Sequence, residues 1–412
     1  MLAILLVESV IFRVNRSEGD TMDMTQKLAK LTLIGAVFSA APVDRKTLFA
    51  GRTDQLRDAI AAVTQRAKHA VIYGERGVGK TSLANIVLEV FGDQVNKPAC
   101  GPINCDETMT FSDLWHTVFR EMHIKDGQTL SQLAPKEIKP DDVRHLLQNI
   151  SKTVLVLDEF DRIGDPKMTI RMADAIKNLS DHGVDTTMVL VGVADSLDAL
   201  LAEHVSIDRN LAQIPMPRMS DVELGEIIDK RANLCAMTIQ DEARDRVITL
   251  SQGLPHYTHV LCLNAFEDAI NRDSETVSVD DCRTAITRAL KGATQSVVSA
   301  YHKAITSPRK DNLYSQVLLA CAMTPTDPLG FFYAGDVRGP MSTIMKAQYD
   351  IPAFSQHLKA FCDLTRGPVL KRDGPVRRYR YRFANPLLQP HVIMHGVTSG
   401  MIQQDQVLRR VA

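Results

Sequence analysis

The sequence predicts an α/β core built on a parallel sheet, then an all-helical domain, then a C-terminal winged-helix domain. From about residue 50 to 217, apolar strand-like runs alternate with helical patterns, which implies a parallel sheet flanked by helices. After Pro217 the pattern is helical to about Ile305. Residues 312–395 then read as three helices and two strand-like pieces around a turn at Asp373-Gly374-Pro375, which is the layout of a winged helix.

The segment Gly74-Glu75-Arg76-Gly77-Val78-Gly79-Lys80-Thr81 fits G-x-x-x-x-G-K-[ST], a phosphate-binding loop. A strand-like run, 69–73, precedes it and a helical run, 82–90, follows it. The glycines let several backbone N–H groups converge on one anion, and the helix N-terminus adds partial positive charge. Lys80 is expected to reach the β- and γ-phosphates of ATP, and the Thr81 hydroxyl to bind Mg²⁺. The alternative is a glycine-rich turn without a ligand.

An acidic pair, Asp158-Glu159, ends the buried strand-like run 153–157. Such a pair is expected as the second half of an ATP site. Asp158 would hold Mg²⁺ through water, and Glu159 would orient and polarise the attacking water. The alternative is an acid that caps a helix. Asp161 is assigned no role.

Arg209 lies between the fourth strand-like run, 187–192, and a short fifth one, 213–216. Phosphoryl transfer needs positive charge near the γ-phosphate, and from this position an arginine could meet the nucleotide of a neighbouring subunit. Arg209 is therefore a candidate catalytic residue. The alternative is a surface arginine paired with a carboxylate such as Asp208.

Composition limits the class of protein. The chain has 412 residues, which suits two or three domains, and 45% apolar with 24% charged residues is ordinary for a soluble globular protein. The net charge of -1 means that nucleic-acid contacts need local patches. Seven scattered cysteines without C-x-x-C indicate reduced thiols and a cytoplasmic location. No membrane segment is expected. Residues 1–47 read as an extension that is partly disordered or follows a mis-called start, and 396–412 as a tail.

A basic run marks the C-terminal hairpin. Residues 366–382 carry seven Lys or Arg against one acid, and Tyr379 and Tyr381 alternate with arginines, so the arginines should share one face. Gln356 and Lys359 lie on the polar side of a helix whose apolar side holds Phe354, Leu358 and Phe361. The residues predicted to contact double-stranded DNA are Gln356, Lys359, Arg377, Arg378 and Arg380. A solvated basic face and a protein-binding winged helix remain alternatives.

Over residues 48–395 the chain resembles the AAA+ ATPases of the origin-recognition and replication-initiator type. The resemblance implies a nucleotide-binding domain at 48–218, a helical lid at 219–306 and a winged helix at 312–395. The segment 48–52 is similar to the family's upstream box, which places Arg52 near the adenine. The segment 103–105 is similar to its second-strand signature, which makes Asn104 the contact of the catalytic Glu159.

Two sensor positions depart from the family pattern. The fourth strand ends in Gly192-Val-Ala-Asp-Ser196, where the family carries asparagine and this chain has Asp195. His256, in Ser251-Gln-Gly-Leu-Pro-His256, falls where the lid usually carries an arginine sensor. A histidine can donate a hydrogen bond to phosphate, and the alternative is a packed or capping histidine. The Gly-Leu-Pro turn is also similar to that of signal-transduction (STAND) ATPases.

The sequence thus predicts a slow ATPase of the AAA+ initiator-like type, which couples its nucleotide state to a winged helix. Its nucleotide-binding residues would be Gly74, Glu75, Arg76, Gly77, Val78, Gly79, Lys80, Thr81, Ser82, Arg52 and His256. ATP and Mg²⁺ are the expected cofactors. Double-stranded DNA and either further copies of the chain or a partner protein are the expected partners. A STAND-like signalling or defence regulator and an accessory subunit with little turnover remain alternatives.

Overall fold

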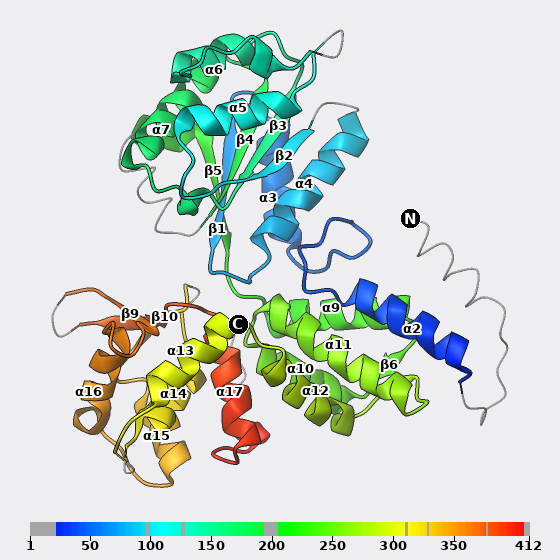
Figure 1. The fold of residues 1–412 in the computed structure, drawn as a ribbon, viewed down its shortest axis with the longest axis vertical. Helices are drawn as coiled ribbons and strands as arrows, with labels where there is room; N and C mark the ends of the chain where they lie inside the picture. Colours follow the sequence, from blue (N-terminus) through cyan, green and yellow to red (C-terminus); the bar gives the residue numbers. More distant parts are fainter. Residues whose placement is uncertain are drawn as a thin grey trace. The chain divides into compact units, whose positions relative to one another are not determined.

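The structure, a computed structural model, describes residues 22–95, 99–124, 128–192, 205–309, 312–327, 329–375 and 378–407. The chain forms two compact units (Figure 1). The first is Pro42–Pro217. The second is Arg218–Ala412 together with the N-terminal segment Met1–Ala41.

A five-stranded parallel sheet is the centre of the first unit, in the order β2-β3-β4-β1-β5. This confirms the predicted parallel α/β core. The first strand and the third end at the candidate site. The strands are β1 (His69–Gly74), β2 (Ala99–Asn104), β3 (Thr153–Asp158), β4 (Thr186–Gly192) and β5 (Leu211–Met216).

Helices cover both faces of this sheet (Figure 1). On one face α3 (Thr53–Thr64) and α4 (Lys80–Val95) pack together. On the other, α5 (Phe111–Glu121), α6 (Pro140–Leu147) and α7 (Pro166–Asp181) form a core with alternate strand residues. The strands are buried on both faces, which explains their nearly continuous apolar sequences.

From Arg218 onward, the second unit contains five α-helices in succession. They are α9 (Asp221–Leu234), α10 (Asp241–Ser251), α11 (Pro255–Asn271), α12 (Val279–Lys291) and α13 (Gln295–Ile305). Ser220 and Glu223 form a capping box at the start of α9. A small parallel sheet of β6 (Thr238–Ile239) and β7 (Thr276–Val277) lies among these helices. Strands of two residues are too short for apolar periodicity to indicate.

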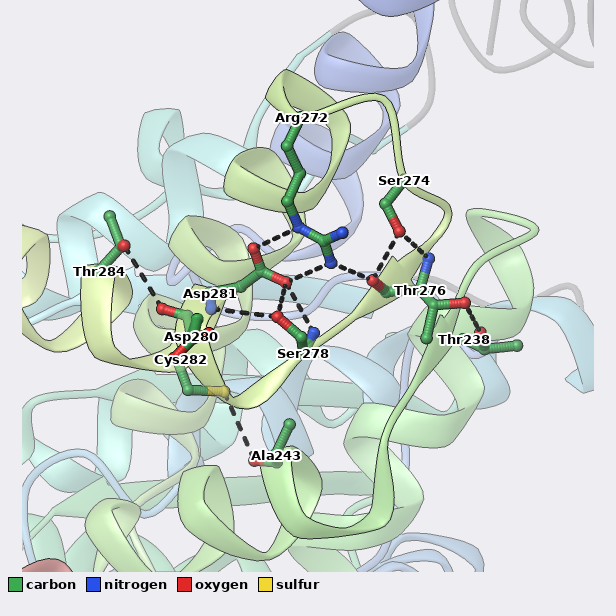
Figure 2. A network of polar contacts seen from close by, with 10 residues as sticks. All are labelled: Thr238, Ala243, Arg272, Ser274, Thr276, Ser278, Asp280, Asp281, Cys282 and Thr284. Carbon is green, nitrogen blue, oxygen red and sulfur yellow. Dashed lines mark hydrogen bonds and ion pairs between the residues drawn. The ribbon is translucent and has the colours of Figure 1, made fainter. Parts of the chain in front are cut away.

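Asp281 ties three of these elements together (Figure 2). Its carboxylate accepts from Arg272 Nε at 2.8 Å and Nη2 at 2.7 Å, and from the backbone and hydroxyl of Ser278. Arg272 also donates to the Thr276 carbonyl at 2.6 Å. Burial by itself raises the pKa of Asp281, but these hydrogen bonds outweigh it and the net pKa is lowered. The end of α11, β7 and the start of α12 are therefore held by one ion pair.

The C-terminal part of the second unit alternates helices with short strands. The order is α14 (Tyr314–Met323), β8 (Phe332–Tyr333), α15 (Arg338–Met345), α16 (Ile351–Cys362), β9 (Leu370–Asp373), β10 (Arg380–Phe383) and α17 (Leu388–Thr398). The three strands form an antiparallel sheet in the order β8-β10-β9. Helix α17 packs against α10, α12, α13 and α14, so this helix contacts both halves of the unit.

The N-terminal extension contributes a helix, α2 (Met24–Val37), to the second unit. Asp23 and Gln26 form its capping box. At its other end, Arg231 Nε donates to the Val37 carbonyl at 3.0 Å, and Phe38 packs on Phe266 at 4.6 Å between ring centroids. Within the described ranges, none of the helices has the length and apolar character needed to cross a membrane.

Candidate nucleotide site

The candidate site is built on the turn between β1 and α4. Gly77 and Gly79 have φ of 88° and 96°, a region that side chains rarely adopt. A Cβ on Gly74 would collide with the main-chain oxygen of Met216 at the end of β5. The turn therefore needs glycine for its backbone conformation and for close packing, as a loop whose N–H groups bind phosphate requires.

Lys80, the first residue of α4, folds over this loop. Its Nζ donates to the carbonyls of Gly74 at 3.0 Å and Glu75 at 2.9 Å. Burial lowers the pKa of Lys80, and the negative charges of Asp161, Asp158 and Glu75 oppose that shift. Of these charges Asp161 acts most strongly, although no sequence pattern assigned it a role.

Thr81 and Asp158 meet at the carboxyl edge of the sheet. Thr81 Oγ1 donates to Asp158 Oδ2 at 2.7 Å, and Asp158 Oδ1 accepts from the Glu159 backbone at 2.7 Å. Asp158 is only 3% exposed. A hydroxyl and a carboxylate side by side are hard oxygen ligands, which fit Mg²⁺ beside a phosphate loop.

Glu159 follows with φ 55° and ψ 34°, a left-handed conformation that is uncommon for a residue with a side chain. The short 3-10 helix η3 (Phe160–Arg162) starts there and brings Arg162 Nη1 to 2.6 Å from Glu159 Oε2. The two side chains are 54% and 47% exposed. Arg162 was not anticipated from the sequence, because one arginine three residues after an acid is a common surface pattern.

Asn104 lies next to this pair at the end of β2. It is in register with Asp158, and the next residue, Cys105, donates its backbone N–H to the Asp158 carbonyl at 2.8 Å. The Asn104 side chain is exposed. Among the described residues, the Glu159 carboxylate accepts a hydrogen bond from the Arg162 side chain and not from Asn104. Burial raises the pKa of Cys105 to about 12, so this thiol is not ionised.

Arg52 is 2% exposed and lies under the loop. Its Nη2 donates to the carbonyls of Val78 at 3.2 Å and Pro217 at 2.5 Å. Arg52 itself has a left-handed backbone at the start of α3. These contacts place the guanidinium against the main chain of the phosphate loop.

The remaining loop residues have different environments. Ser82 Oγ accepts from the Val43 backbone at 3.0 Å, so this hydroxyl anchors the segment before α3. Val78 is fully buried and Arg76 is exposed.

Arg209 lies in the 3-10 helix η4 (Val205–Asn210), just before β5. Its side chain is exposed, and Asp208, the carboxylate that could have paired with it, accepts from Gln213 instead at 2.7 Å. The first residue of β5, Leu211, is level with His69, the first residue of β1. Arg209 is therefore at the amino edge of the sheet, opposite the phosphate loop. Asp195 lies outside the described residues.

His256 belongs to the second unit. It lies in the first turn of α11, directly after Pro255. Its ring is half-buried and meets the Tyr257 ring edge-on at 5.4 Å.

The candidate DNA-contacting residues are also in the second unit. Gln356 and Lys359 are exposed on α16, on the side away from its buried phenylalanines, and Arg378 is exposed in the β9–β10 turn. Arg380 pairs with Asp373 at 2.6 Å and lies 4.0 Å over the Phe331 ring. Arg377 lies outside the described residues.

Arg366, part of the same basic run, has internal partners. It donates to the carbonyls of Ala304 and Thr306 at 2.8 and 2.9 Å and lies 3.4 Å over the Tyr314 ring. Its charge therefore stabilises the unit and is less available to a phosphate.

Comparison with known proteins agrees with this geometry. The AAA domain family matches residues 63–201. The ORC2 protein of Aeropyrum pernix, solved in ADPNP–ADP complexes, is similar in structure with a TM-score of 0.50 and 15% identity over 90% of this chain and 98% of that one. The Walker-type ATPase PABY2304 of Pyrococcus abyssi is similar with a TM-score of 0.52 and 13% identity, over 86% and 99% of the two chains. No curated protein matches the chain in sequence.

The matched domain contains both the phosphate loop and the acidic pair, and the structural similarity extends over most of the chain. Residues 63–201 therefore contain an AAA domain, and the fold of the chain is similar to that of these two solved structures.

Proposed function

We propose that the protein binds and hydrolyses Mg·ATP in its first unit. The observation that carries this proposal is the meeting of Lys80, the Thr81–Asp158 pair and Glu159 at one edge of the sheet. A bound Mg²⁺ would neutralise charge on the phosphates. Loop N–H groups and Lys80 would bind and orient the phosphates, and Thr81 and Asp158 would hold the metal.

Glu159 is the proposed general base. Its carboxylate accepts the proton of a water directed at the γ-phosphate, and Asn104 on the neighbouring strand is proposed to orient it. For Arg52, the contacts with Val78 and Pro217 favour support of the phosphate loop over direct contact with adenine. His256 is proposed as a sensor only by analogy with the family.

Two substitutions test the chemistry. Lys80→Ala is expected to abolish ATP binding, because it removes the cation that reaches the β- and γ-phosphates. Glu159→Gln is expected to keep ATP binding and lose hydrolysis, because the amide keeps the shape of the side chain but cannot accept a proton from water. Glu107→Gln, an exposed acid nearby, is the matched control. Affinity is measured with a fluorescent ATP analogue and turnover by phosphate release. Wild-type turnover in Glu159→Gln would remove Glu159 from the role of base.

We propose further that the C-terminal region is a winged helix that binds double-stranded DNA, in a cytoplasmic protein that works as an oligomer or with a partner protein. The order helix–strand–helix–helix–strand–strand from α14 to β10 is that of a winged helix. Gln356 and Lys359 are exposed on α16, its recognition helix by position. The test is duplex-DNA affinity by fluorescence anisotropy at several salt concentrations, with ATP and with ADP. The proposal fails if no salt-sensitive affinity is found in either state.

A STAND-like regulator whose winged helix binds protein is the second candidate. The contacts of Arg366 and Arg380 favour it, because both charges have partners inside the unit. This candidate gains if ATP drives oligomerisation, measured by sedimentation, while duplex DNA changes neither the assembly nor the ATPase rate.

A further inference from the structure

A chain of hydrogen bonds leads from the phosphate loop to the junction between the two units. Arg52 Nη2 donates at once to the carbonyl of Val78, in the loop, and to that of Pro217, the last residue of the first unit. One guanidinium nitrogen thus connects the loop that surrounds a phosphate with the residue at which the unit ends. A displacement of the Val78 carbonyl would therefore act on the same guanidinium that binds the Pro217 carbonyl.

The next residue, Arg218, starts a second set of contacts inside the second unit. Its Nη1 donates to the Gln252 carbonyl at 3.3 Å and to Gln389 Oε1 at 2.6 Å. Gln389 is 1% exposed, and its Nε2 donates to the Ala322 carbonyl at 2.7 Å. Gln389 is in α17 and Ala322 in α14, so one buried amide connects Arg218 with the C-terminal region.

Met219, the residue after Arg218, also binds the turn that leads to His256. Met219 donates its backbone N–H to the Gly253 carbonyl at 2.8 Å, next to the Gln252 carbonyl that Arg218 contacts. A further bond runs from the hydroxyl of Tyr257, on α11, to the Leu387 carbonyl just before α17, at 2.6 Å. The lid turn and α17 are therefore fastened to each other at two places.

From these contacts we propose that Arg52, Arg218 and Gln389 form a relay, which carries the state of the phosphate loop through the Pro217–Arg218 peptide to the winged helix. The proposal rests on the proposed function and names how its two halves are coupled. All three act as positioning residues in this relay. Lid and winged helix would respond together, because Gln389 and Tyr257 tie α17 to both.

The covalent junction suits this task. The peptide between Pro217 and Arg218 is planar, so a rotation of the Pro217 carbonyl turns the Arg218 amide with it. The proline ring fixes φ at residue 217, so fewer backbone dihedral angles can rotate and absorb such a movement. Each side chain in the relay donates to main-chain carbonyls, and these move with the backbone of the element to which they belong.

The test uses the full-length chain with pairs of fluorophores. One label is placed at Lys136→Cys in the first unit, and the other at either Asn233→Cys in the lid or Leu364→Cys in the winged region; all three positions are exposed. The half-buried Cys362 is replaced by Ser, because the other cysteines are buried. Energy transfer is compared between saturating ATP and ADP in a Glu159→Gln background, which is expected to prevent turnover.

The relay predicts a different result for each variant. In the unsubstituted relay, both label pairs respond to the exchange of ADP for ATP. Gln389→Met, similar in volume, should keep the response of the lid label and reduce that of the winged-region label at least about twofold. Arg52→Gln should reduce both responses. Arg52→Lys keeps the charge without the planar fork, and serves if Arg52→Gln does not fold. Arg57→Gln, exposed on α3, is the matched control and should change neither response.

The outcomes separate the two proposals. If both responses persist in Gln389→Met and in the folded Arg52 variant, the relay is overturned while the proposed function stands. If ATP binds but neither label pair responds even without relay substitutions, the proposed coupling of nucleotide to the winged helix fails, and the relay fails with it. Thermal unfolding of each variant verifies that a lost response is not lost structure.

Discussion

Arg162 Nη1 donates to Glu159 Oε2 across 2.6 Å, so a guanidinium occupies one oxygen of the carboxylate proposed to polarise the attacking water. The left-handed backbone of Glu159 and the short helix η3 place the two side chains together. Both side chains are about half exposed, so their ion pair is weak and a bound substrate could break it.

We therefore expect Arg162→Gln to raise basal turnover, because the Glu159 carboxylate is released. The gain should be no more than about fivefold, the effect of a modest exposed ion pair. Arg162→Lys keeps the charge but not the planar fork, and should fall between wild type and Arg162→Gln. The measurement is phosphate release at saturating ATP. A fall in turnover for Arg162→Gln would mean that this arginine supports catalysis.

The second prediction concerns Arg209, which cannot reach the phosphate loop of its own chain. It precedes β5 at the amino edge of the sheet, and β1 runs from that edge to Gly74 over five residue steps, about 17 Å. If Arg209 acts on a γ-phosphate, that phosphate belongs to another copy. Turnover per chain should then rise with protein concentration, and Arg209→Ala should lower it by ~100-fold or more.

Mixing experiments sharpen this prediction. Arg209→Ala and Glu159→Gln subunits, each inactive alone, should recover some turnover when mixed, because each supplies what the other lacks at one interface. Arg57→Ala, an exposed arginine on α3, is the control and should behave as wild type. A turnover number that is independent of concentration in a monomeric sample would exclude the role in trans.

The phosphate loop and the acidic pair could be predicted from sequence because their signals are local. Gly77, Gly79 and Lys80 are fixed by the geometry of one strand–loop–helix turn, and Asp158 by the end of one buried strand. The roles of Arg52 and Arg162 could not be predicted in the same way. Arg52 contacts carbonyls 26 and 165 residues away. The contact of Arg162 with Glu159 depends on the left-handed backbone of Glu159, which the residue type does not predict.

The same distinction applies to the folded units. The parallel sheet of the first unit could be predicted from its apolar strands, whereas β6, β7 and β8 have two residues each and leave no periodic signal. Helix α2 is likewise hard to predict, because the burial of Leu33, Ile34 and Val37 depends on packing within the second unit.

The third prediction concerns the basic hairpin. Replacing Arg377, Arg378 and Arg380 with Glu should weaken duplex binding and reduce the slope of log affinity against log salt. Each phosphate contact contributes about 0.9 to that slope, so the loss of two or three contacts lowers it by roughly 2. Nucleotide affinity should stay unchanged, because these residues are in the other unit from the phosphate loop.

Arg366→Gln is the informative control for that experiment. Its guanidinium is used on the carbonyls of Ala304 and Thr306 and on the ring of Tyr314, so the salt slope should stay at the wild-type value while stability falls. If Arg366→Gln lowered the slope as much as the triple substitution, loss of structure and not loss of phosphate contacts would explain both.

The last prediction concerns pH and the stability of the first unit. His69 is fully buried at the start of β1, where its Nδ1 accepts from the Met188 backbone at 3.0 Å and its Nε2 is 3.1 Å from Ser180 Oγ. Because Nδ1 accepts a hydrogen bond, the ring is neutral and Nε2 carries the proton. Burial lowers the pKa of His69 to about 4, from 6.5. Between these two pH values the unfolded chain binds a proton that the folded chain does not.

Stability should therefore be complete above pH 6.5 and fall as the pH drops toward 4, by about 1.4 kcal/mol per pH unit from this residue alone. Trp115, the one tryptophan of the chain, is buried in the same unit, so its fluorescence during urea unfolding reports on this unit. In His69→Asn the amide oxygen can still accept from Met188 but does not titrate. The difference between the two proteins should shrink as the pH falls from 6.5 to 4, because only the wild type loses stability through this residue. A difference that is constant over this range would show that His69 does not couple proton binding to folding.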